Sequence, residues 1–317
     1  MSRYSLSIII PHYNVPELLD RLIESVPARD DIQIIIVDDN STKKQAELEA
    51  VIEKHSGRVL EFYRNETGKN SAGTCRNIGL KHAEGKWIVF ADSDDYFVDG
   101  WFDIVSEYVA SEYEIVFFNP TSIVLDTGML GTRHKMYSDK VEAYMEEPNH
   151  KNEILLRYAF PVPWSKLYRR SFIEKYEIRF EAVRYSNDER FALDCGHKLT
   201  KFACSGETIY CVTTHSGSLT TTPSKENYDT RQRVYIRKYG FLFNNMSEED
   251  IHTLDLDYLP LYMLYNTVAS GYGIKLALEY KRMLRKLGVP LVNWKYVNPL
   301  KLLESALKSA FERIKRT

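Results

Sequence analysis

The sequence has few cysteines and no long apolar segment. Its cysteines show none of the Cys-x-x-Cys spacing of zinc sites; they are Cys75, Cys195, Cys204 and Cys211. We expect free thiols in a reducing compartment. The apolar run from Leu6 to Ile10 is too short for a signal peptide, and no segment approaches the roughly 18 apolar residues of a membrane span. These absences predict a cytoplasmic protein.

A strong net charge and a glycine-rich phosphate loop are also missing. The 42 Lys and Arg residues nearly balance the 44 Asp and Glu residues, so composition gives no reason to expect nucleic-acid binding. After the first expected strand the sequence reads Pro11-His12-Tyr13-Asn14 instead of Gly-x-Gly-x-x-Gly. Pro11 and Tyr13 cannot provide the close backbone approach that glycine allows, which disfavours a nicotinamide-dependent enzyme.

Strand and helix patterns alternate through the first 120 residues. Short apolar runs predict strands at 5–10, 32–37, 59–63, 87–91 and 115–118. Amphipathic segments predict helices from Pro16, after Ser41 or Thr42, at 74–83 and at 99–110. This alternation predicts an α/β fold with a Rossmann-like, mostly parallel central sheet flanked by helices. Ligands of such sheets bind beyond the carboxyl ends of the strands, where the polar clusters of this sequence should gather.

The pattern changes after about residue 120. A hairpin is expected at 123–130, a helix within 139–160, and short strands with loops over 205–222. Amphipathic helices then continue to residue 317. We therefore expect one domain over residues 1–222, divided near residue 120, and an α-helical C-terminal region over 223–317.

Two acidic clusters follow expected strands. Asp92-Ser93-Asp94-Asp95 places three carboxylates within four residues, which repel one another unless a cation or a helix N-terminus offsets their charge. Mg²⁺ and Mn²⁺ prefer such oxygens together with phosphate oxygens, but helix capping with solvated carboxylates is an equal alternative. The cluster Asp38-Asp39-Asn40-Ser41-Thr42 could form a turn and a helix cap, or accept hydrogen bonds from a ribose or base.

Four blocks together resemble a known family. They are Ser7 to Asn14 (SIIIPHYN), Ile36 to Thr42 (IVDDNST), Arg76 to Gly79 (RNIG) and Asp92 to Asp95 (DSDD). Their order and spacing are similar to those of the family 2 inverting glycosyltransferases of the GT-A fold, among them bacterial capsular, exopolysaccharide and O-antigen enzymes. The resemblance covers roughly residues 5–220. It implies transfer of a sugar from a nucleotide diphosphate donor, with a UDP-sugar favoured, to a hydroxyl of a glycan or lipid-linked glycan.

The resemblance also assigns roles within the first half of the chain. The domain at 1–222 would be catalytic, with 1–120 holding the nucleotide sugar and 121–222 forming the acceptor side. The segment containing Pro11, Tyr13 and Asn14 would hold the nucleoside together with Asp39. Arg76 would reach the nucleotide or its diphosphate; its alternative is a surface charge on a helix.

A divalent cation is implied as the cofactor. In the related enzymes the acidic turn meets the donor: Asp94 would ligate the Mn²⁺ or Mg²⁺ that bridges the diphosphate. Asp92 would face the ribose side and is a second candidate metal ligand, and Ser93 would lie beside it. His215 lies where related enzymes place a loop that closes over the diphosphate, and its imidazole could complete the metal shell. A structural histidine is the alternative.

An inverting transfer needs a base for the acceptor proton. The family places a Glu-Asp pair before an apolar or aromatic residue, and the match here is Asn187-Asp188-Glu189. It departs from the family because Asn187 stands where Glu is usual. Asp188 fits the base position, and Glu189 is a rival if the register slips by one residue. An Asp that caps a helix beside a solvated Glu is the structural alternative.

Two further segments resemble the family or suggest a partner. Trp164 could stack on a sugar and Lys166 could meet phosphate, although Trp164 could equally be a packing residue.

At the end of the chain, Pro299 to Thr317 predicts a basic amphipathic helix. Such a helix could lie on the inner face of the membrane or pack on the catalytic domain.

A metal-dependent glycosyltransferase is the function that these residues favour. A nucleotidyltransferase is one rival, but it would require a basic, glycine-rich loop after the first strand to bind a triphosphate, and Pro11 to Asn14 is not such a loop. The other rival is a sugar-nucleotide-binding or scaffold protein without catalysis, for which the departure at Asn187 is the only support.

Overall fold

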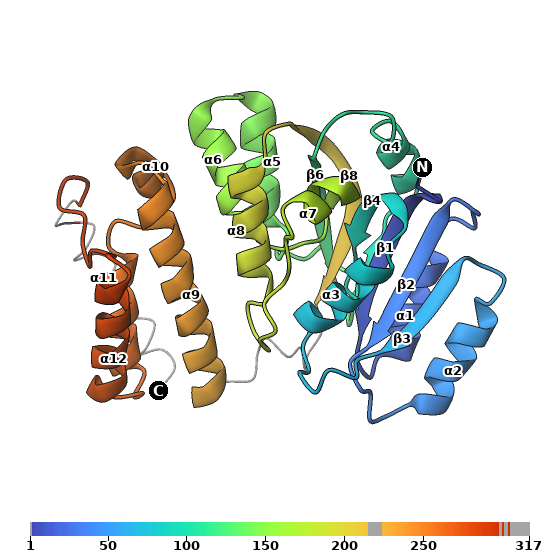
Figure 1. Ribbon diagram of the computed structural model, residues 1–317, viewed down its shortest axis with the longest axis horizontal. Coiled ribbons are helices and arrows are strands. Elements are labelled where there is room, and N and C mark those ends of the chain that lie inside the picture. Colours follow the sequence, from blue (N-terminus) through green and yellow to red (C-terminus); the bar gives the residue numbers. More distant parts are fainter. Residues whose placement is uncertain (1, 215–223, 298–299, 301–303, 305–317) are drawn as a thin grey trace. The chain divides into compact units, whose positions relative to one another are not determined.

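A computed structural model describes residues 2–214 and 224–297, together with 300 and 304. The chain divides into two compact units, Met1–Pro223 and Ser224–Thr317. The first unit holds the sheet and the second holds helices (Figure 1).

The first unit is built on a sheet of eight strands in the order β3-β2-β1-β4-β7-β6-β8-β5. The strands are β1 (Tyr4–His12), β2 (Ile32–Asp38), β3 (Leu60–Arg64), β4 (Gly85–Phe90), β5 (Tyr96–Phe97), β6 (Ile115–Val124), β7 (Lys166–Arg169) and β8 (Phe202–Thr214). β1 pairs in parallel with β2 and with β4, and β2 pairs in parallel with β3. β7 is antiparallel to β4 and β6, and β5 is antiparallel to β8. The sheet is therefore mixed.

Helices flank this sheet (Figure 1). They are α1 (Pro16–Glu24), α2 (Gln45–Lys54), α3 (Ala72–His82), α4 (Trp101–Ser106), α5 (Lys135–Glu146), α6 (His150–Tyr158), α7 (Arg170–Lys175) and α8 (Asp188–Lys198). The predicted α/β fold is confirmed, and the isoleucine-rich runs of β1 and β2 are buried on both faces, as parallel strands require. α3 packs closely on β1 at Gly79, where a Cβ atom would lie 2.4 Å from Ile9 Cγ2.

The second half of this unit departs from the sequence prediction. Residues 205–222 were expected to form short strands, whereas β8 is a single strand of 13 residues that pairs in parallel with β6. The expected hairpin at 123–130 is reduced to one bridge between Ile123 and Leu130. The expected helix within 139–160 is split into α5 and α6, because Asn149 caps α6 by accepting a hydrogen bond from the Asn152 amide at 2.9 Å.

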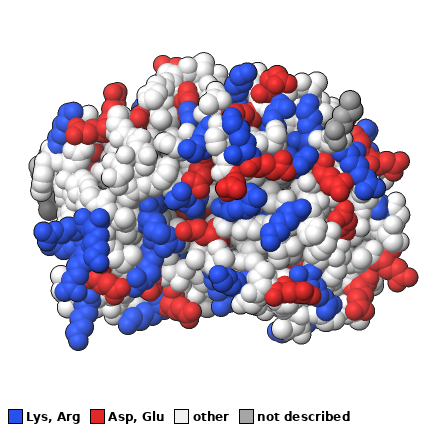
Figure 2. All heavy atoms as spheres, viewed as in Figure 1, with Lys and Arg blue, Asp and Glu red and all other residues white. Residues whose placement is uncertain are grey.

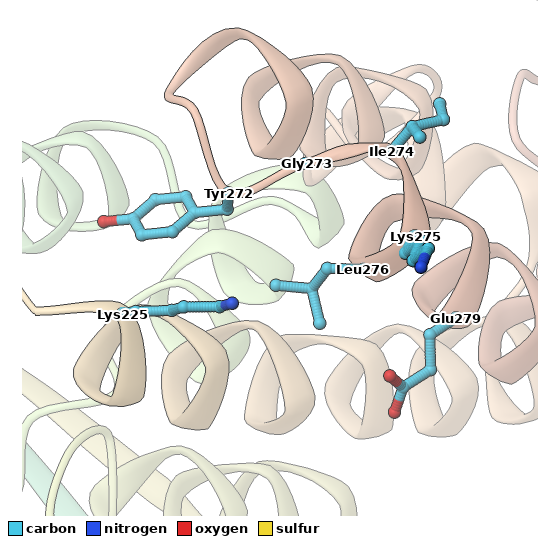
Figure 3. A pocket seen from close by; sticks show the side chains of 7 residues that line it. All are labelled: Lys225, Tyr272, Gly273, Ile274, Lys275, Leu276 and Glu279. Atoms are coloured by element: carbon cyan, nitrogen blue, oxygen red, sulfur yellow. The ribbon is translucent and has the colours of Figure 1, made fainter.

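The C-terminal unit contains α9 (Lys225–Asn245), α10 (Glu248–Thr253), α11 (Leu259–Ala269) and α12 (Ile274–Lys286). Tyr280 on α12 donates a hydrogen bond to Asp229 on α9 at 2.7 Å, and Arg233 pairs with the same carboxylate. A pocket lies between the starts of α9 and α12, with Lys225 and Leu276 pointing into it (Figure 3). Within the described ranges, the longest helices are too short or too polar to cross a membrane. The helix predicted over 299–317 falls outside the described residues, except at positions 300 and 304.

Candidate active site

Polar side chains at the ends of β1 and β2 form one buried network. His12 Nδ1 lies 3.0 Å from Asp38 Oδ1, and the Ser41 hydroxyl donates to the same oxygen at 2.5 Å. The Val15 amide donates to His12 Nε2 at 3.3 Å. His12 therefore accepts at Nε2, and its Nδ1 faces the carboxylate of Asp38. This network fixes the end of β1 against the end of β2.

Asn14 extends the connection between the two loops. Its backbone amide donates to Ser41 Oγ at 2.9 Å, and its side-chain oxygen accepts from the amides of Thr42 and Lys43. Its φ of 58° lies in the left-handed region that asparagine tolerates. Pro11 is buried within β1, whereas Tyr13 is 43% exposed. Of the predicted nucleoside residues in this loop, Tyr13 presents the accessible side chain.

Asp39 directly follows the last residue of β2. The Asn65 side-chain amide donates to Asp39 Oδ1 at 2.7 Å. Burial raises the pKa of Asp39, although the hydrogen bond from Asn65 opposes that shift. Asp39 is half-buried, so part of its carboxyl group remains accessible.

The acidic turn after β4 is supported from β8. Tyr210 Oη accepts a hydrogen bond from the Asp92 amide at 2.8 Å and donates to Asp95 Oδ2 at 3.0 Å. Thr213 donates its amide to Asp95 Oδ1 at 2.7 Å and its hydroxyl to the Asp94 carbonyl at 2.5 Å. Burial, followed by the charges of Asp94 and Asp92, raises the pKa of Asp95 well above its usual value. Asp95 is thus an interior support, and Asp92 and Asp94 are the half-buried carboxylates of the turn.

Arg76 joins the acidic turn to the segment of the predicted base. It lies on α3 and is only 5% exposed. Its Nη2 pairs with Asp92, and its Nη1 donates to Asn187 Oδ1 at 3.0 Å. The guanidinium carbon also lies 5.3 Å from the centre of the Phe180 ring. A buried cation with these contacts is a structural link between 92 and 187, which rules out the alternative of a surface charge.

α3 also holds the chain that leads into α8. Asn77 donates to the Phe180 carbonyl at 2.8 Å and accepts from the Phe180 amide at 2.9 Å. At Gly73 an added Cβ would lie 2.8 Å from Asn187 Cβ, so only glycine permits this close packing. These contacts place Asp188, the first residue of α8, directly after the residue that Arg76 contacts.

Asp188 has the protonation behaviour expected of a general base. Burial is the main cause that raises its pKa to about 6, with a smaller contribution from the charge of Glu189, while Arg76 opposes the shift. A carboxyl group with a pKa near 6 is ionised at neutral pH and is more basic than an ordinary aspartate. Arg76 thus joins Asp92 to Asn187, and Asp188 is the next residue in the chain after Asn187.

The structure corrects the expectations for Trp164 and Lys166. Trp164 is 2% exposed and stacks on Tyr210 with ring centres 5.8 Å apart, so it packs in the core instead of offering a face to a sugar. Lys166 is 3% exposed and donates to the carbonyls of Phe160 and Val162. Burial lowers its pKa to about 7, and an ammonium group so enclosed is not placed to meet a phosphate. His215, the third residue predicted from the second half, lies outside the described residues.

The sequence prediction missed the supporting residues Tyr210, Thr213, Asn77 and His12. Asn77 follows Arg76 within the RNIG block, and His12 lies within the SIIIPHYN block, so both have a local signal in the sequence. Tyr210 and Thr213 carry no local signal, because they are buried residues within the continuous buried run of β8. Only the fold brings them to the acidic turn.

Replacing Tyr210 with Phe should destabilise the acidic turn without removing the ring. The change leaves the Asp92 amide and the Asp95 carboxyl group each without one partner, so we expect the free energy of unfolding to fall by about 1–3 kcal/mol. We also expect a higher KM for the donor. Denaturant unfolding and donor kinetics measure the two effects. Tyr4→Phe, on a buried tyrosine at the opposite end of β1, is the control; equal effects of both changes would contradict a role for Tyr210 in the turn.

Comparison with known proteins defines the class as a glycosyltransferase with the GT-A fold. More specifically, the chain belongs to glycosyl transferase family 2, whose family model matches residues 7–177. The chain is 28% identical over 302 residues to the uncharacterized glycosyltransferase EpsJ of Bacillus subtilis, covering 89% of this chain and 83% of that protein. It is 26% identical over 280 residues to the GalNAc(5)-diNAcBac-PP-undecaprenol beta-1,3-glucosyltransferase of Campylobacter jejuni, covering 88% and 85%.

Solved structures give the same fold. The crystal structure of S. aureus TarS 1–349 in complex with UDP-GlcNAc matches with a TM-score of 0.65 at 19% identity, covering 91% of this chain and 84% of that chain. The mannosyltransferase PcManGT from Pyrobaculum calidifontis, in complex with GDP-Man and Mn²⁺, matches with a TM-score of 0.54 at 13% identity, covering 98% and 80%. At these identities the likeness shows the fold alone.

Proposed function

We propose that this glycosyltransferase inverts the anomeric centre by direct displacement. Asp188 takes the proton of the acceptor hydroxyl as that oxygen attacks the anomeric carbon from the face opposite the departing nucleoside diphosphate. The observation that carries the proposal is the contact of Arg76 with both Asp92 and Asn187. Through this contact the base and the acidic turn are held in one assembly. An α-linked donor would give a β-linked product.

The donor half of the site is proposed at residues 1–120, and the acceptor half, which contributes Asp188, at 121–222. The exposed ring of Tyr13 and the carboxyl group of Asp39 are the proposed contacts of the nucleoside, with Asn14 and buried Pro11 shaping the loop. A UDP-sugar is the favoured donor, because the acidic residue after β2 suits hydrogen bonds from a nucleoside and the structural neighbour TarS is seen with UDP-GlcNAc.

The acidic turn fits a divalent cation that is completed by the donor. Within the described part of the chain no group of three His, Cys, Asp or Glu side chains forms a metal site by itself. Mg²⁺ and Mn²⁺ in phosphate-transfer sites, however, use one or two carboxylates plus phosphate oxygens. Asp94 is the proposed ligand, with Asp92 and Ser93 beside it, since Asp92 is already paired with Arg76. A bound cation would offset the negative charge that the leaving diphosphate develops.

The acceptor is proposed to be a glycan or lipid-linked glycan in bacterial surface polysaccharide synthesis, at the cytoplasmic face of the membrane. The relative from Campylobacter jejuni supports this, because its name specifies an undecaprenol-linked acceptor. The decisive experiment is NMR of the product formed from an α-linked UDP-sugar, together with identification of the released nucleotide. We expect a β-linked product and UDP; retention of configuration would refute the displacement, and release of pyrophosphate would indicate nucleotidyl transfer.

The pKa of Asp188 predicts how activity depends on pH. The Asp188 carboxyl group accepts a proton only when it is ionised. Its raised pKa of about 6 means that its ionisation changes within the pH range over which activity is measured. We therefore expect kcat/KM to be level above neutral pH and to fall about tenfold per pH unit below pH 6. Kinetics at saturating cation across this range will measure it. A profile that stays level down to pH 4.5, about 1.5 units below that pKa, would contradict the assignment.

A further inference from the structure

Charge is divided unevenly along the chain. Residues 224–317 contain 16 Lys and Arg against 10 Asp and Glu, whereas residues 1–223 contain 26 against 34. The near-neutral composition therefore combines a C-terminal unit of formal charge +6 with a catalytic unit of -8. The excess positive charge is therefore carried by the chain after residue 223, and a surface that attracts anions is expected there.

α12 presents such a surface. Its buried residues, Ala277, Tyr280 and Leu284, face α9 and α11. The helical repeat places 275, 278, 282 and 286 on the opposite side, with 274, 281 and 285 beside them, and all seven are exposed. This exposed face consists of two apolar and five basic residues, here named the α12 face: Ile274, Leu278, Lys275, Lys281, Arg282, Arg285 and Lys286.

The basic charge of the α12 face is not neutralised locally. Glu279, the acidic residue of this helix, pairs with Arg233 of α9 at 2.6 Å. Among the described residues, no carboxylate forms an ion pair with the five basic residues of the face. Lys and Arg gather over α12 in the space-filling view (Figure 2, lower left).

The apolar residues distinguish between possible anionic partners. Ile274 is 60% exposed and Leu278 is 45% exposed. A soluble polyanion would leave both side chains in water. A membrane surface would bury them at the boundary of headgroups and acyl chains while the surrounding cations meet anionic lipid headgroups.

We infer that the α12 face docks this transferase on an anionic membrane surface. This surface lies before residue 299, so it is separate from the amphipathic helix predicted at the end of the chain. Docking here would keep the enzyme at the surface that a lipid-linked acceptor occupies. The inference does not depend on the identity of the donor or of the base, and its test needs no transferase activity.

The test is co-sedimentation of the full chain with vesicles of phosphatidylcholine alone, or with about one third phosphatidylglycerol. We expect binding to the anionic vesicles only, weakened by salt. The double variant Lys281→Glu, Arg285→Glu should bind at least about tenfold more weakly. The matched control, Lys151→Glu with Lys201→Glu, reverses two exposed lysines of the catalytic unit and should change binding less than about twofold. Equal binding to neutral vesicles, or unchanged binding of the α12 variant, would overturn the inference.

A second variant separates a membrane from a soluble polyanion. Ile274→Ser with Leu278→Ser keeps every charge, and we expect it to lose about tenfold or more of its vesicle affinity while its binding to heparin is unchanged. Circular dichroism of each variant checks that the helices are retained. If this variant binds vesicles as the unaltered protein does, the surface binds polyanions by charge alone and the membrane assignment is wrong.

Discussion

Replacing Asp188 with Asn is expected to lower kcat by about 10²–10⁴-fold, which is the usual contribution of a positioned general base. The amide has nearly the same shape as the carboxyl group but cannot accept the acceptor proton. Arg76 contacts Asn187 and Asp92 and does not depend on the Asp188 carboxylate for its hydrogen bonds. The donor site should therefore survive, so that the affinity for UDP, measured by calorimetry, stays within about threefold of the unaltered enzyme.

Glu189→Gln is the matched control for this prediction. Glu189 is the neighbouring carboxyl group and the rival base if the register is shifted, and it is 6% exposed on the inner side of α8. We expect its replacement to change kcat by less than about tenfold, since Glu189 is buried whereas the neighbouring Asp188 is partly exposed and can reach an acceptor hydroxyl. Loss of activity in Glu189→Gln together with full activity in Asp188→Asn would exchange the two roles.

The sheet's first half could be predicted because its signals are local. The runs of isoleucine in β1 and β2 require burial on both faces, and a strand with two buried faces has few positions other than the middle of a parallel sheet. The polar clusters at 38–42 and 92–95 follow strands that end at the same edge. Their proximity therefore follows from strand direction alone.

The second half could not be predicted in this way because its contacts are long-range. Tyr210 lies 118 residues from Asp92 along the chain, and Lys166 Nζ lies 5.5 Å from the centre of the Phe117 ring on β6. The same limit applies to Trp164, where the sequence left sugar stacking and core packing open and the fold buries the ring against Tyr210. Local patterns identify residue types, whereas burial decides what those residues can contact.

The presence of Asn187, where the family usually has Glu, can be explained by the contacts of Arg76. Arg76 is a buried cation, and its pairing with Asp92 supplies one opposite charge. A glutamate at 187 would compete for the same guanidinium and would add a negative charge next to Asp188, raising the pKa of that carboxyl group further. The neutral amide of Asn187 accepts the hydrogen bond of Arg76 without either effect. The departure therefore agrees with a base that is ionised at neutral pH, and it lends no support to a protein without catalysis.

Replacing Asp94 with Asn should abolish the effect of a divalent cation on donor binding. The backbone of Asp94 is fixed independently of its carboxylate, because its carbonyl accepts hydrogen bonds from Arg21 at 2.7 Å and from Thr213 at 2.5 Å. The turn should thus persist while the proposed cation ligand is lost. We expect kcat/KM to fall by about 10²–10³-fold, the scale on which loss of charge stabilisation in a transition state is felt.

The measurement that isolates this role is calorimetric binding of UDP with and without Mn²⁺, because it needs no acceptor and no catalysis. For the unaltered chain, added Mn²⁺ should tighten UDP binding; for Asp94→Asn it should not. Asp99→Asn makes the same chemical change at an exposed carboxylate five residues further along and should leave the Mn²⁺ effect intact. If Asp94→Asn still binds UDP more tightly with Mn²⁺, the cation is held elsewhere. Since Asp92 is already paired with Arg76, the acidic turn would then be a structural element and not the binding site of the cation that contacts the donor's diphosphate.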